Sequence, residues 1–361
     1  MKSIAIEPAP DFERFLDTLL LRKAYRRPPI FDFHIAPEHK ARVLGRPVKT
    51  PADDPEFFYL AGYDYVHCTA LFIPEEMLEK AGKASGGTHS SDDGFLSSLE
   101  QFRSQRWSWQ DLAEGDLTKA ERELEWISGV AEALPEGMKI VFQTADVFTF
   151  AWTMIGFSPF CFLSVDEPEF ISEVMGSLAA VTLNLSREAA KRAGDKLGAV
   201  FYSDDIAYKT GLMLGPDFFV ENLFPIIEKF GEIGKEHGVP LIYHSDGRLF
   251  DVFDELAKIG VRGIQPLEPI SMDPLEIKQR WPGKFCLMGN IDLDLLSRGT
   301  PEETERHVRE KIERLNVGGG YMPGVSNTVP YYVKFENYKR MIETVYSYGL
   351  NPKTFLNHGV Q

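Results

Sequence analysis

Short apolar segments alternate with longer segments of helical periodicity along most of the chain. Most of the apolar segments do not alternate between apolar and polar positions, which is typical of strands that are buried on both faces. The pattern therefore predicts eight strands, at residues 30–35, 63–71, 139–143, 199–205, 239–244, 262–268, 285–290 and 319–324.

The segments between these strands carry apolar residues at intervals of three and four, and several begin at proline or end beside glycine. One helix is predicted from about residue 148, and others at residues 11–26, 54–61, 117–134, 167–192, 216–237, 250–259, 274–280, 301–315 and 335–348. Eight strand-then-helix units predict a parallel (β/α)8 barrel and a single domain over residues 1–361. A doubly wound sheet is the alternative, but no Gly-x-Gly-x-x-Gly motif follows the first predicted strand.

Residues 72–137 interrupt the alternation between the second and third strands. Residues 82–94 are polar and rich in glycine, and the aromatic residues Phe102, Trp107 and Trp109 follow them. We interpret this segment as an insertion that is part loop and part cover. Because glycines permit hinge motion beside a barrel mouth, we predict that the 82–94 loop closes over a ligand.

Charge and composition restrict the class of partner. The 361 residues are 43% hydrophobic and 26% charged, which is typical of a soluble globular protein. A net charge of −15 repels nucleic acid and anionic lipid, so neither is an expected partner. The first residues do not form a signal peptide, and no segment has 18 uncharged apolar residues, so we expect a cytoplasmic protein. Three widely spaced cysteines predict neither a disulfide framework nor a Cys-x-x-Cys site.

In a (β/α)8 barrel the active site lies at the carboxyl ends of the strands. Each single polar residue at such a position is explained equally well as a helix cap or a hydrogen-bonded core residue, but their density here exceeds what capping requires. The residues at these positions are His34, His67, Gln143 with Asp146, Asp204 with Asp205, His244 with Asp246, Gln265 with Glu268, Asn290 with Asp292, and Ser326 with Asn327.

The most concentrated group follows the apolar run at residues 239–243, where His244 and Asp246 precede a glycine. Two kinds of chemistry use such residues. Imidazole and carboxylate ligands hold a divalent metal that acts as a Lewis acid, and Glu268 and Asp205 supply further donors. Alternatively, the same groups shuttle protons without a metal. Basic residues are scarce at the carboxyl ends of the predicted strands, where Arg248 is the exception and Lys209 a weaker one. A substrate with many carboxylates would therefore find few positive charges there to neutralise it.

Several segments together resemble the uroporphyrinogen decarboxylase superfamily, which also contains cobalamin-dependent methyltransferases. The resemblance covers roughly residues 20–350, and it implies a (β/α)8 barrel. The segments that carry it are residues 148–156 with 166–170, residues 203–225, His244-Ser245-Asp246-Gly247, residues 265–269, residues 287–292, and residues 318–321 with Glu336-Asn337.

The positions that handle the tetrapyrrole in true decarboxylases differ in this chain. Those enzymes carry an Arg-Gln-Ala-Gly-Arg-Tyr-type motif after the first strand, where this chain has residues 33–39, Phe-His-Ile-Ala-Pro-Glu-His. Their essential aspartate, their tyrosine and their late Gly-His-Gly match Leu71, Thr153 and Gly324-Val325-Ser326. The resemblance therefore does not imply decarboxylation of uroporphyrinogen.

The methyltransferase branch is more similar. Its members bind zinc through a His-x-Cys pair and a further Cys, and the matching residues here are His244, Asp246 and Ser326. With Glu268 or Asp205 as a further ligand, the metal site would be rich in oxygen atoms. Such a site suits a metal that polarises an ether or amine donor, whose methyl group is then transferred to a corrinoid protein. The aromatic residues that suit a flat uncharged donor, or else pack in the core, are Phe33, Phe142, Phe148, Trp152 and Tyr202.

The leading hypothesis is thus a zinc-dependent methyltransferase component that transfers a methyl group from a small donor, such as a methoxylated aromatic compound, to cobalamin on a partner protein. We expect metal ligands at His244, Asp246 and Glu268, and catalytic roles for Asp205, His244 and Asp246. One alternative is a metal-free decarboxylase acting on a small or aromatic acid, and another is a non-catalytic corrinoid- or tetrapyrrole-binding protein. The residues expected to contact substrate are His34, His67, Gln143, Trp152, Tyr202, Arg248, Asn290 and Ser326.

Overall fold

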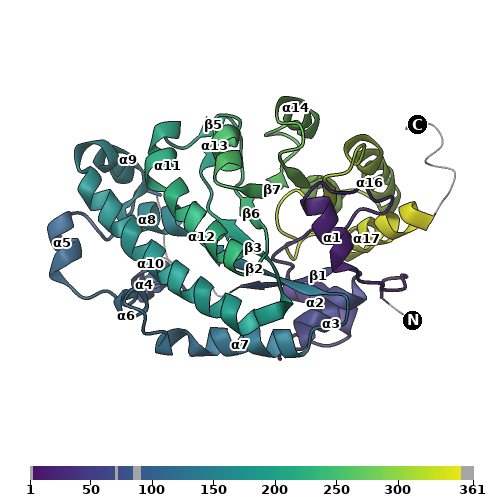
Figure 1. The fold of residues 1–361 in the computed structure, drawn as a ribbon, viewed down its shortest axis with the longest axis horizontal. Helices are drawn as coiled ribbons and strands as arrows, with labels where there is room; N and C mark the ends of the chain where they lie inside the picture. The colour runs from purple at the N-terminus through teal and green to yellow at the C-terminus, as the bar shows by residue number, and fades with distance from the viewer. Residues whose placement is uncertain (1–2, 70–71, 84–90, 351–361) are drawn as a thin grey trace.

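Seven strands form one curled parallel sheet in a computed structural model that describes residues 3–69, 72–83 and 91–350 (Figure 1). Their β-branched and aromatic residues are buried by helices on the outside and by the opposite wall inside. The expected (β/α)8 type of fold is confirmed. The strands, in sheet order, are β1 (Tyr65–Thr69), β2 (Lys139–Ala145), β3 (Leu197–Ser203), β6 (Leu241–His244), β7 (Val261–Leu267), β8 (Cys286–Ile291) and β9 (Tyr321–Val325).

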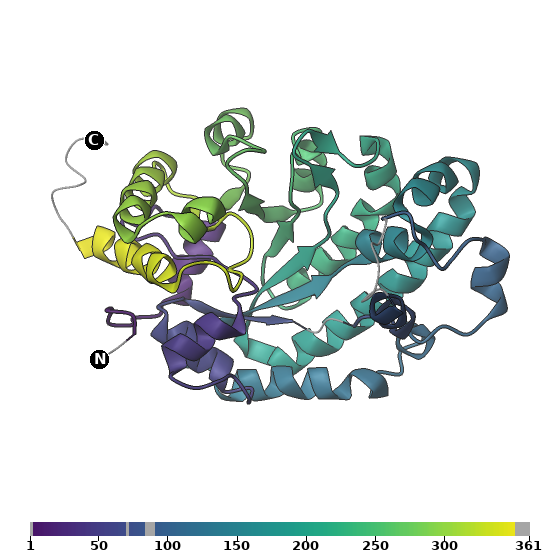
Figure 2. The same cartoon turned by 180° about the vertical axis from the view of Figure 1, so that it is seen from behind.

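The predicted strand at residues 30–35 is wrong as a strand, because it makes only one isolated bridge, from Ile35 to Val329. The segment still lies between the two edge strands, β1 and β9. Hydrogen bonds that involve side chains take the place of the backbone-to-backbone hydrogen bonds of a regular strand. The Asp32 carboxylate accepts from the Val325 backbone N–H at 2.7 Å, and the Tyr65 hydroxyl accepts from the Asp32 N–H at 2.9 Å. In both views the N-terminal helices lie beside the C-terminal helix, so the two ends of the sheet lie on the same side of the molecule (Figures 1 and 2).

Asp32 is fully buried, and its second oxygen accepts from the Tyr63 hydroxyl at 2.6 Å. Burial raises the pKa of Asp32 to about 6, and the hydrogen bonds from Tyr63 and Val325 oppose that rise. Gly324 is required beside it, because a Cβ there would lie 1.8 Å from the Phe31 carbonyl oxygen.

Helices cover the outer face of the sheet, and most predicted ones are present. α1 (Phe12–Leu19) ends earlier than expected, since Leu21 has a positive φ of 58°. The helix expected at residues 216–237 is two helices, because Pro225 cannot donate a backbone hydrogen bond. The others are α2 (Pro37–Leu44), α3 (Asp53–Leu60), α8 (Val147–Ile155), α9 (Phe157–Asp166), α10 (Pro168–Ala193), α11 (Pro216–Asn222), α12 (Phe224–Glu236), α13 (Phe253–Lys258), α14 (Pro274–Arg280), α15 (Leu293–Arg298), α16 (Pro301–Leu315) and α17 (Phe335–Leu350).

The insertion between β1 and β2 is mainly helical and packs on the long helix α10. Trp109 is fully buried, stacks on Trp107 with ring centroids 4.9 Å apart, and donates from Nε1 to the Ser177 hydroxyl on α10. The 82–94 loop lies largely outside the described residues, so its expected closure stays a prediction. The helices of the insertion are α4 (Glu75–Lys83), α5 (Leu99–Ser104), α6 (Gln110–Ala113) and α7 (Glu121–Glu132).

Two loops at the carboxyl ends of β3 and β6 are fastened to each other. A short hairpin, β4 (Ala207–Tyr208) and β5 (Gly211–Leu212), follows β3. The Ser245 hydroxyl accepts from the Ile206 N–H at 3.0 Å, and the Tyr208 carbonyl accepts from the Arg248 N–H at 2.9 Å. Gly247 has a φ of 87°, and a Cβ there would lie 2.5 Å from the Ala207 carbonyl oxygen. The chain on either side of Asp246 is therefore held against the loop that carries Asp205.

In the described part of the chain, no single helix has the length and apolar composition needed to cross a membrane. Only α8 and α9 taken together meet that test, and they are bent by 100° at their junction.

Replacing Asp32 tests its role in joining the ends of the sheet. Asp32→Leu leaves the Val325 N–H and the Tyr63 hydroxyl without their buried acceptor, so we expect the free energy of unfolding to fall by roughly 2–5 kcal/mol. Asp32→Asn keeps an acceptor for Val325 and should lose less than about 2 kcal/mol. Urea denaturation measures both, with the exposed Asp217→Asn as control; equal losses for Leu and Asn would contradict the role.

The raised pKa of Asp32 also predicts a pH dependence. Because the folded protein holds this proton more tightly than the unfolded chain, the carboxyl contributes stability below about pH 4 that is lost as pH rises through about 6. Asp32→Asn should flatten the stability profile over that window. An unchanged profile would show that Asp32 does not titrate there.

Candidate metal centre

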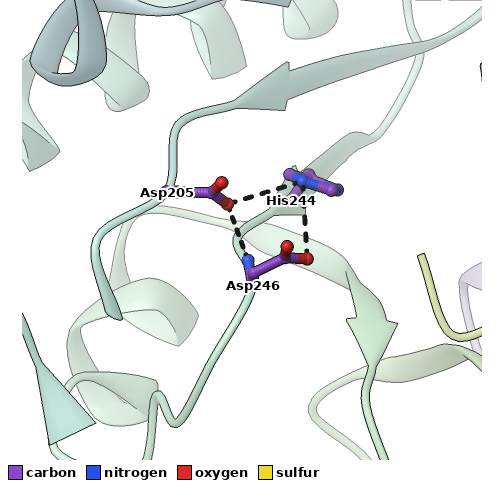
Figure 3. Close-up of side chains that lie close together, drawn as sticks. All are labelled: Asp205, His244 and Asp246. Carbon is purple, nitrogen blue, oxygen red and sulfur yellow. Dashed lines mark hydrogen bonds and ion pairs between the residues drawn. The ribbon is translucent and has the colours of Figure 1, made fainter. Parts of the chain in front are cut away.

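Three side chains converge at the carboxyl ends of β3 and β6: His244 is the last residue of β6, and Asp205 and Asp246 belong to the loops that follow the two strands (Figure 3). Asp205, His244 and Asp246 each offer one ligand atom, and these atoms all lie within 4.8 Å of one another. His244 Nε2 lies 3.6 Å from Asp205 Oδ1 and 4.0 Å from Asp246 Oδ1. We call this group the trio. Within the trio, His244 and Asp246 face a common space.

His244 is the buried member of the trio. Its Nδ1 lies 2.5 Å from Gln265 Oε1, which leaves Nε2 directed at the two carboxylates. The rings of Phe33 and Phe201 pack edge-on against the imidazole, with centroids at 4.7 and 5.9 Å. The imidazole is thus held in one orientation.

Hydrogen bonds also orient the carboxylates. Asp205 Oδ1 accepts from the Asp246 backbone N–H at 2.7 Å, and Asp246 Oδ2 accepts from Asn327 Nδ2 at 2.7 Å. The other oxygen of Asp246, Oδ1, is buried without a hydrogen-bond partner in the described structure. Burial raises the pKa of Asp246 to about 6; His244 opposes the rise, while Asp205 and Glu268 add to it.

These residues fit a divalent metal. Two atoms that each lie about 2.0–2.1 Å from zinc at a tetrahedral angle are roughly 3.3–3.4 Å apart. The separations of 3.6 and 4.0 Å within the trio are slightly wider, and both are too long for hydrogen bonds. A cation between the atoms would neutralise two close carboxylates and give Asp246 Oδ1 a partner.

A cavity of about 480 Å³ adjoins the trio. Asn327, which holds Asp246, is part of its wall, and so are Glu268 and Ser326. The wall also includes Ile270, Asp292, Leu293, Asp294, Arg298 and Tyr332.

Comparison with known families decides the relationship. The sequence model of the family described as uroporphyrinogen decarboxylase (URO-D) matches residues 98–348. The chain belongs to the uroporphyrinogen decarboxylase family. Among solved structures, a methyltransferase from Methanosarcina mazei is similar, with a TM-score of 0.69 and 15% identity over 94% of this chain and 99% of that one. A search of curated proteins gave no significant match.

In this member of the uroporphyrinogen decarboxylase family, two of the positions that match decarboxylase residues make structural contacts. Thr153, where decarboxylases have tyrosine, donates its hydroxyl to the Thr149 carbonyl within α8 at 2.6 Å. Gly324 packs against the Phe31 carbonyl, and Leu71 lies outside the described residues.

Glu268, expected as a metal ligand, is not in the trio, and Asp205 takes that place. Glu268 Oε2 accepts from the Gly247 N–H at 3.0 Å and from the Ser271 hydroxyl at 2.9 Å. Its observed role is therefore to support the loop that carries Asp246.

His34 and His67 contact the Phe33 ring, which also packs against His244, and Gln143 lies beside His67. His67 Nε2 lies 2.7 Å from Gln143 Oε1, and Gln143 Nε2 donates to the Ser203 hydroxyl at 2.9 Å. Burial, helped by His34, holds the pKa of His67 well below its ordinary value. Solvent reaches His34, but protein surrounds most of its ring, and this desolvation with the nearby His244 lowers its pKa to about 4. Both imidazoles are neutral at pH 7.

Tyr202 was expected to contact substrate, and this is wrong. Tyr202 is fully buried between Phe230 and Tyr243, and its hydroxyl donates to Asp204 at 2.8 Å. Asp204 accepts in turn from two backbone N–H groups at the start of α8, at 2.6 and 2.8 Å, so it caps that helix.

The remaining aromatic and basic residues that were expected near the substrate differ in burial. Phe33, Phe142 and Phe148 are core residues, and Trp152 is half-buried with its ring edge-on to Phe157. The Arg248 guanidinium lies over the Phe250 ring, 5.0 Å from its centroid.

Asn290 and Ser326 lie at the ends of β8 and β9. Asn290 is buried and donates to the Leu267 carbonyl at 3.1 Å. Ser326 lines the cavity, and its hydroxyl accepts from the Leu293 N–H at 3.3 Å.

Gln265 and Asn327 contact the trio. The sequence placed both at the carboxyl ends of strands but predicted no catalytic, metal-binding or substrate-binding role for them. Both stand at strand ends, and Gln265 is the register partner of His244. That pairing is the signal that could have identified Gln265.

The buried position of Tyr202 predicts that its hydroxyl serves stability alone. Tyr202→Phe removes one hydrogen bond to Asp204 and should lower the free energy of unfolding by about 1–2 kcal/mol. Zinc affinity should not change. Urea denaturation and zinc titration measure the two effects, and a large change in affinity would place Tyr202 in the site after all.

Proposed function

We propose that this protein is a zinc-dependent methyltransferase component that transfers a methyl group from a small donor to a corrinoid carried by a partner protein. The observation that carries the proposal is the trio, in which an imidazole nitrogen and two carboxylate oxygens face one another without hydrogen bonds between them. Similarity in fold to the Methanosarcina mazei methyltransferase and membership of the family support it.

Zinc would be held by His244 Nε2, Asp246 Oδ1 and Asp205. Three protein ligands are the number that catalytic zinc sites use, which keeps a fourth position for a donor atom. When bound, zinc supplies Lewis acidity toward the heteroatom that carries the methyl group. The protein contributes the orientation: Gln265 holds the imidazole, while Asn327 and the Asp246 backbone hold the carboxylates. Two carboxylates with one neutral imidazole suit a hard oxygen or nitrogen donor better than a thiol.

The cavity beside the trio indicates the charge of the donor. Glu268, Asp292 and Asp294 contribute three carboxylates to its wall. Among the described residues of that wall, the basic side chain is Arg298, and Asp294 accepts from it at 2.9 Å. Among the described residues of the cavity wall, no basic side chain is thus left unpaired to bind a substrate carboxylate. This favours a neutral methoxylated compound over the acid substrate of a decarboxylase.

Metal content tests the proposed centre. Protein purified without added metal should contain about one zinc per chain. His244→Ala and Asp246→Ala should weaken zinc binding by more than about 100-fold, because each removes a ligand. Metal analysis and titration with a fluorescent chelator measure this, with the exposed His237→Ala as control. Wild-type affinity in the His244 variant would remove the metal centre.

Methyl transfer separates an enzyme from a binding protein. Cob(I)alamin mixed with the protein and a methoxylated aromatic compound should show the spectral change to methylcobalamin. Asp205→Asn should slow the change by roughly 10- to 1000-fold, since it weakens the hold on the metal. Corrinoid binding with no methyl transfer from any neutral donor would favour the non-catalytic alternative.

A further inference from the structure

The buried side-chain amide of Gln265 contacts the trio through His244. Gln265 on β7 is the register partner of His244 on β6, and its side chain has no exposure to solvent. Its Oε1 lies 2.5 Å from His244 Nδ1, a short hydrogen-bond distance. An amide oxygen only accepts, so in this arrangement the imidazole carries its proton on Nδ1.

The tautomer decides what His244 presents to the two carboxylates. With the proton on Nδ1, the lone pair of Nε2 points toward Asp205 Oδ1 and Asp246 Oδ1. With the proton on Nε2, that nitrogen would donate to one of them, and a donated bond would bring the atoms to about 2.7–3.2 Å. The observed separations are 3.6 and 4.0 Å. The geometry therefore favours the tautomer whose Nε2 can bind a metal.

The surroundings leave the imidazole little freedom to exchange its two nitrogens by rotation. Phe33 and Phe201 pack edge-on to the ring, and His244 is 7% exposed. The Gln265 backbone carbonyl also accepts from the Ser245 N–H at 3.0 Å, which ties the two strand ends together. The Gln265 side chain thus meets a ring that is already held in place, and the bond it makes selects the protonated nitrogen.

We propose that Gln265 is a positioning residue of the trio, which fixes His244 as the Nδ1–H tautomer and so prepares Nε2 to bind a metal. Its role in metal binding rests on the proposed function, but the tautomer does not. Groups that hydrogen-bond to a metal-bound histidine in this way typically change metal affinity by 10- to 100-fold when removed.

The barrel contains a matched pair for comparison. His67 on β1 lies against Gln143 of β2 with the same kind of contact, Nε2 to Oε1 at 2.7 Å. There the amide is itself oriented, because Gln143 Nε2 donates to Ser203. The Gln265 Nε2 has no partner among the described residues, so the Nδ1 contact is what orients that amide. Gln143→Leu therefore removes an equivalent bond from a histidine outside the trio.

Nitrogen-15 NMR of the metal-free protein with labelled histidine tests the tautomer directly. At pH 8 we expect His244 to be protonated at Nδ1 in the wild type and in Gln265→Glu, whose carboxylate also accepts. In Gln265→Leu the signal should shift toward the Nε2–H form. Gln143→Leu should leave His244 unchanged. An Nε2–H form in the wild type would overturn the proposal whether or not any variant folds.

Zinc titration of the same proteins gives the second measurement. Gln265→Leu should bind zinc about 10- to 100-fold more weakly than the wild type, while Gln265→Glu and Gln143→Leu should stay within about threefold. An unchanged affinity in Gln265→Leu would overturn the proposed role in metal binding. If the wild type shows the Nδ1–H form but binds no zinc, the metal centre fails and the assignment of the tautomer stands.

Discussion

A parallel sheet that curls on itself must join its two edges, and here a buried carboxylate makes that junction. Asp32 lies between β1 and β9 on a segment that is not a strand. Its carboxylate accepts from the Val325 N–H of β9, which in a paired strand would donate to a backbone carbonyl. The arrangement places an ionisable group at full burial, where its charge is costly. Both of its oxygens accept hydrogen bonds, one from Val325 of β9 and one from Tyr63 just before β1, and these bonds hold the segment between the two edge strands.

The trio depends on a second, more local constraint. Asp205 and Asp246 belong to different loops, and the close backbone approach of Gly247 to the β4–β5 hairpin brings those loops together. Glu268 then supports the Gly247 N–H from the next strand. Backbone contacts therefore fix the frame from which the side chains of the trio project. This frame allows the two carboxylates to lie close together without a lysine or arginine among the trio.

Much of the architecture could be predicted from sequence because buried parallel strands leave a clear apolar pattern. The irregular structure of residues 30–35 could not be predicted, because their alternating apolar residues are also typical of a strand. Only tertiary contacts show that the Asp32 side chain takes the place of the backbone hydrogen bonds of a strand pair. Side-chain direction along a strand carries further information. Successive residues at the end of β3 point to opposite faces, so Phe201 and Ser203 face the interior while Tyr202 faces the helices. The two residues after the strand continue this alternation, with Asp204 bound to the start of α8 and Asp205 beside His244. The choice of Asp205 over Glu268 required the hairpin, which sequence did not predict.

The insertion between β1 and β2 bears on how far this chain could be shortened. Trp107 and Trp109 are buried, Trp109 donates to Ser177 of α10, and Arg103 donates to Glu169 of the same helix at 2.7 Å. Removing residues 91–134 would uncover one side of this 26-residue helix and expose apolar surface that a minimal barrel has nothing to cover. The segment is thus an integral wall of the domain, and a trimmed version of this protein would need a redesigned α10 to avoid association through that apolar surface.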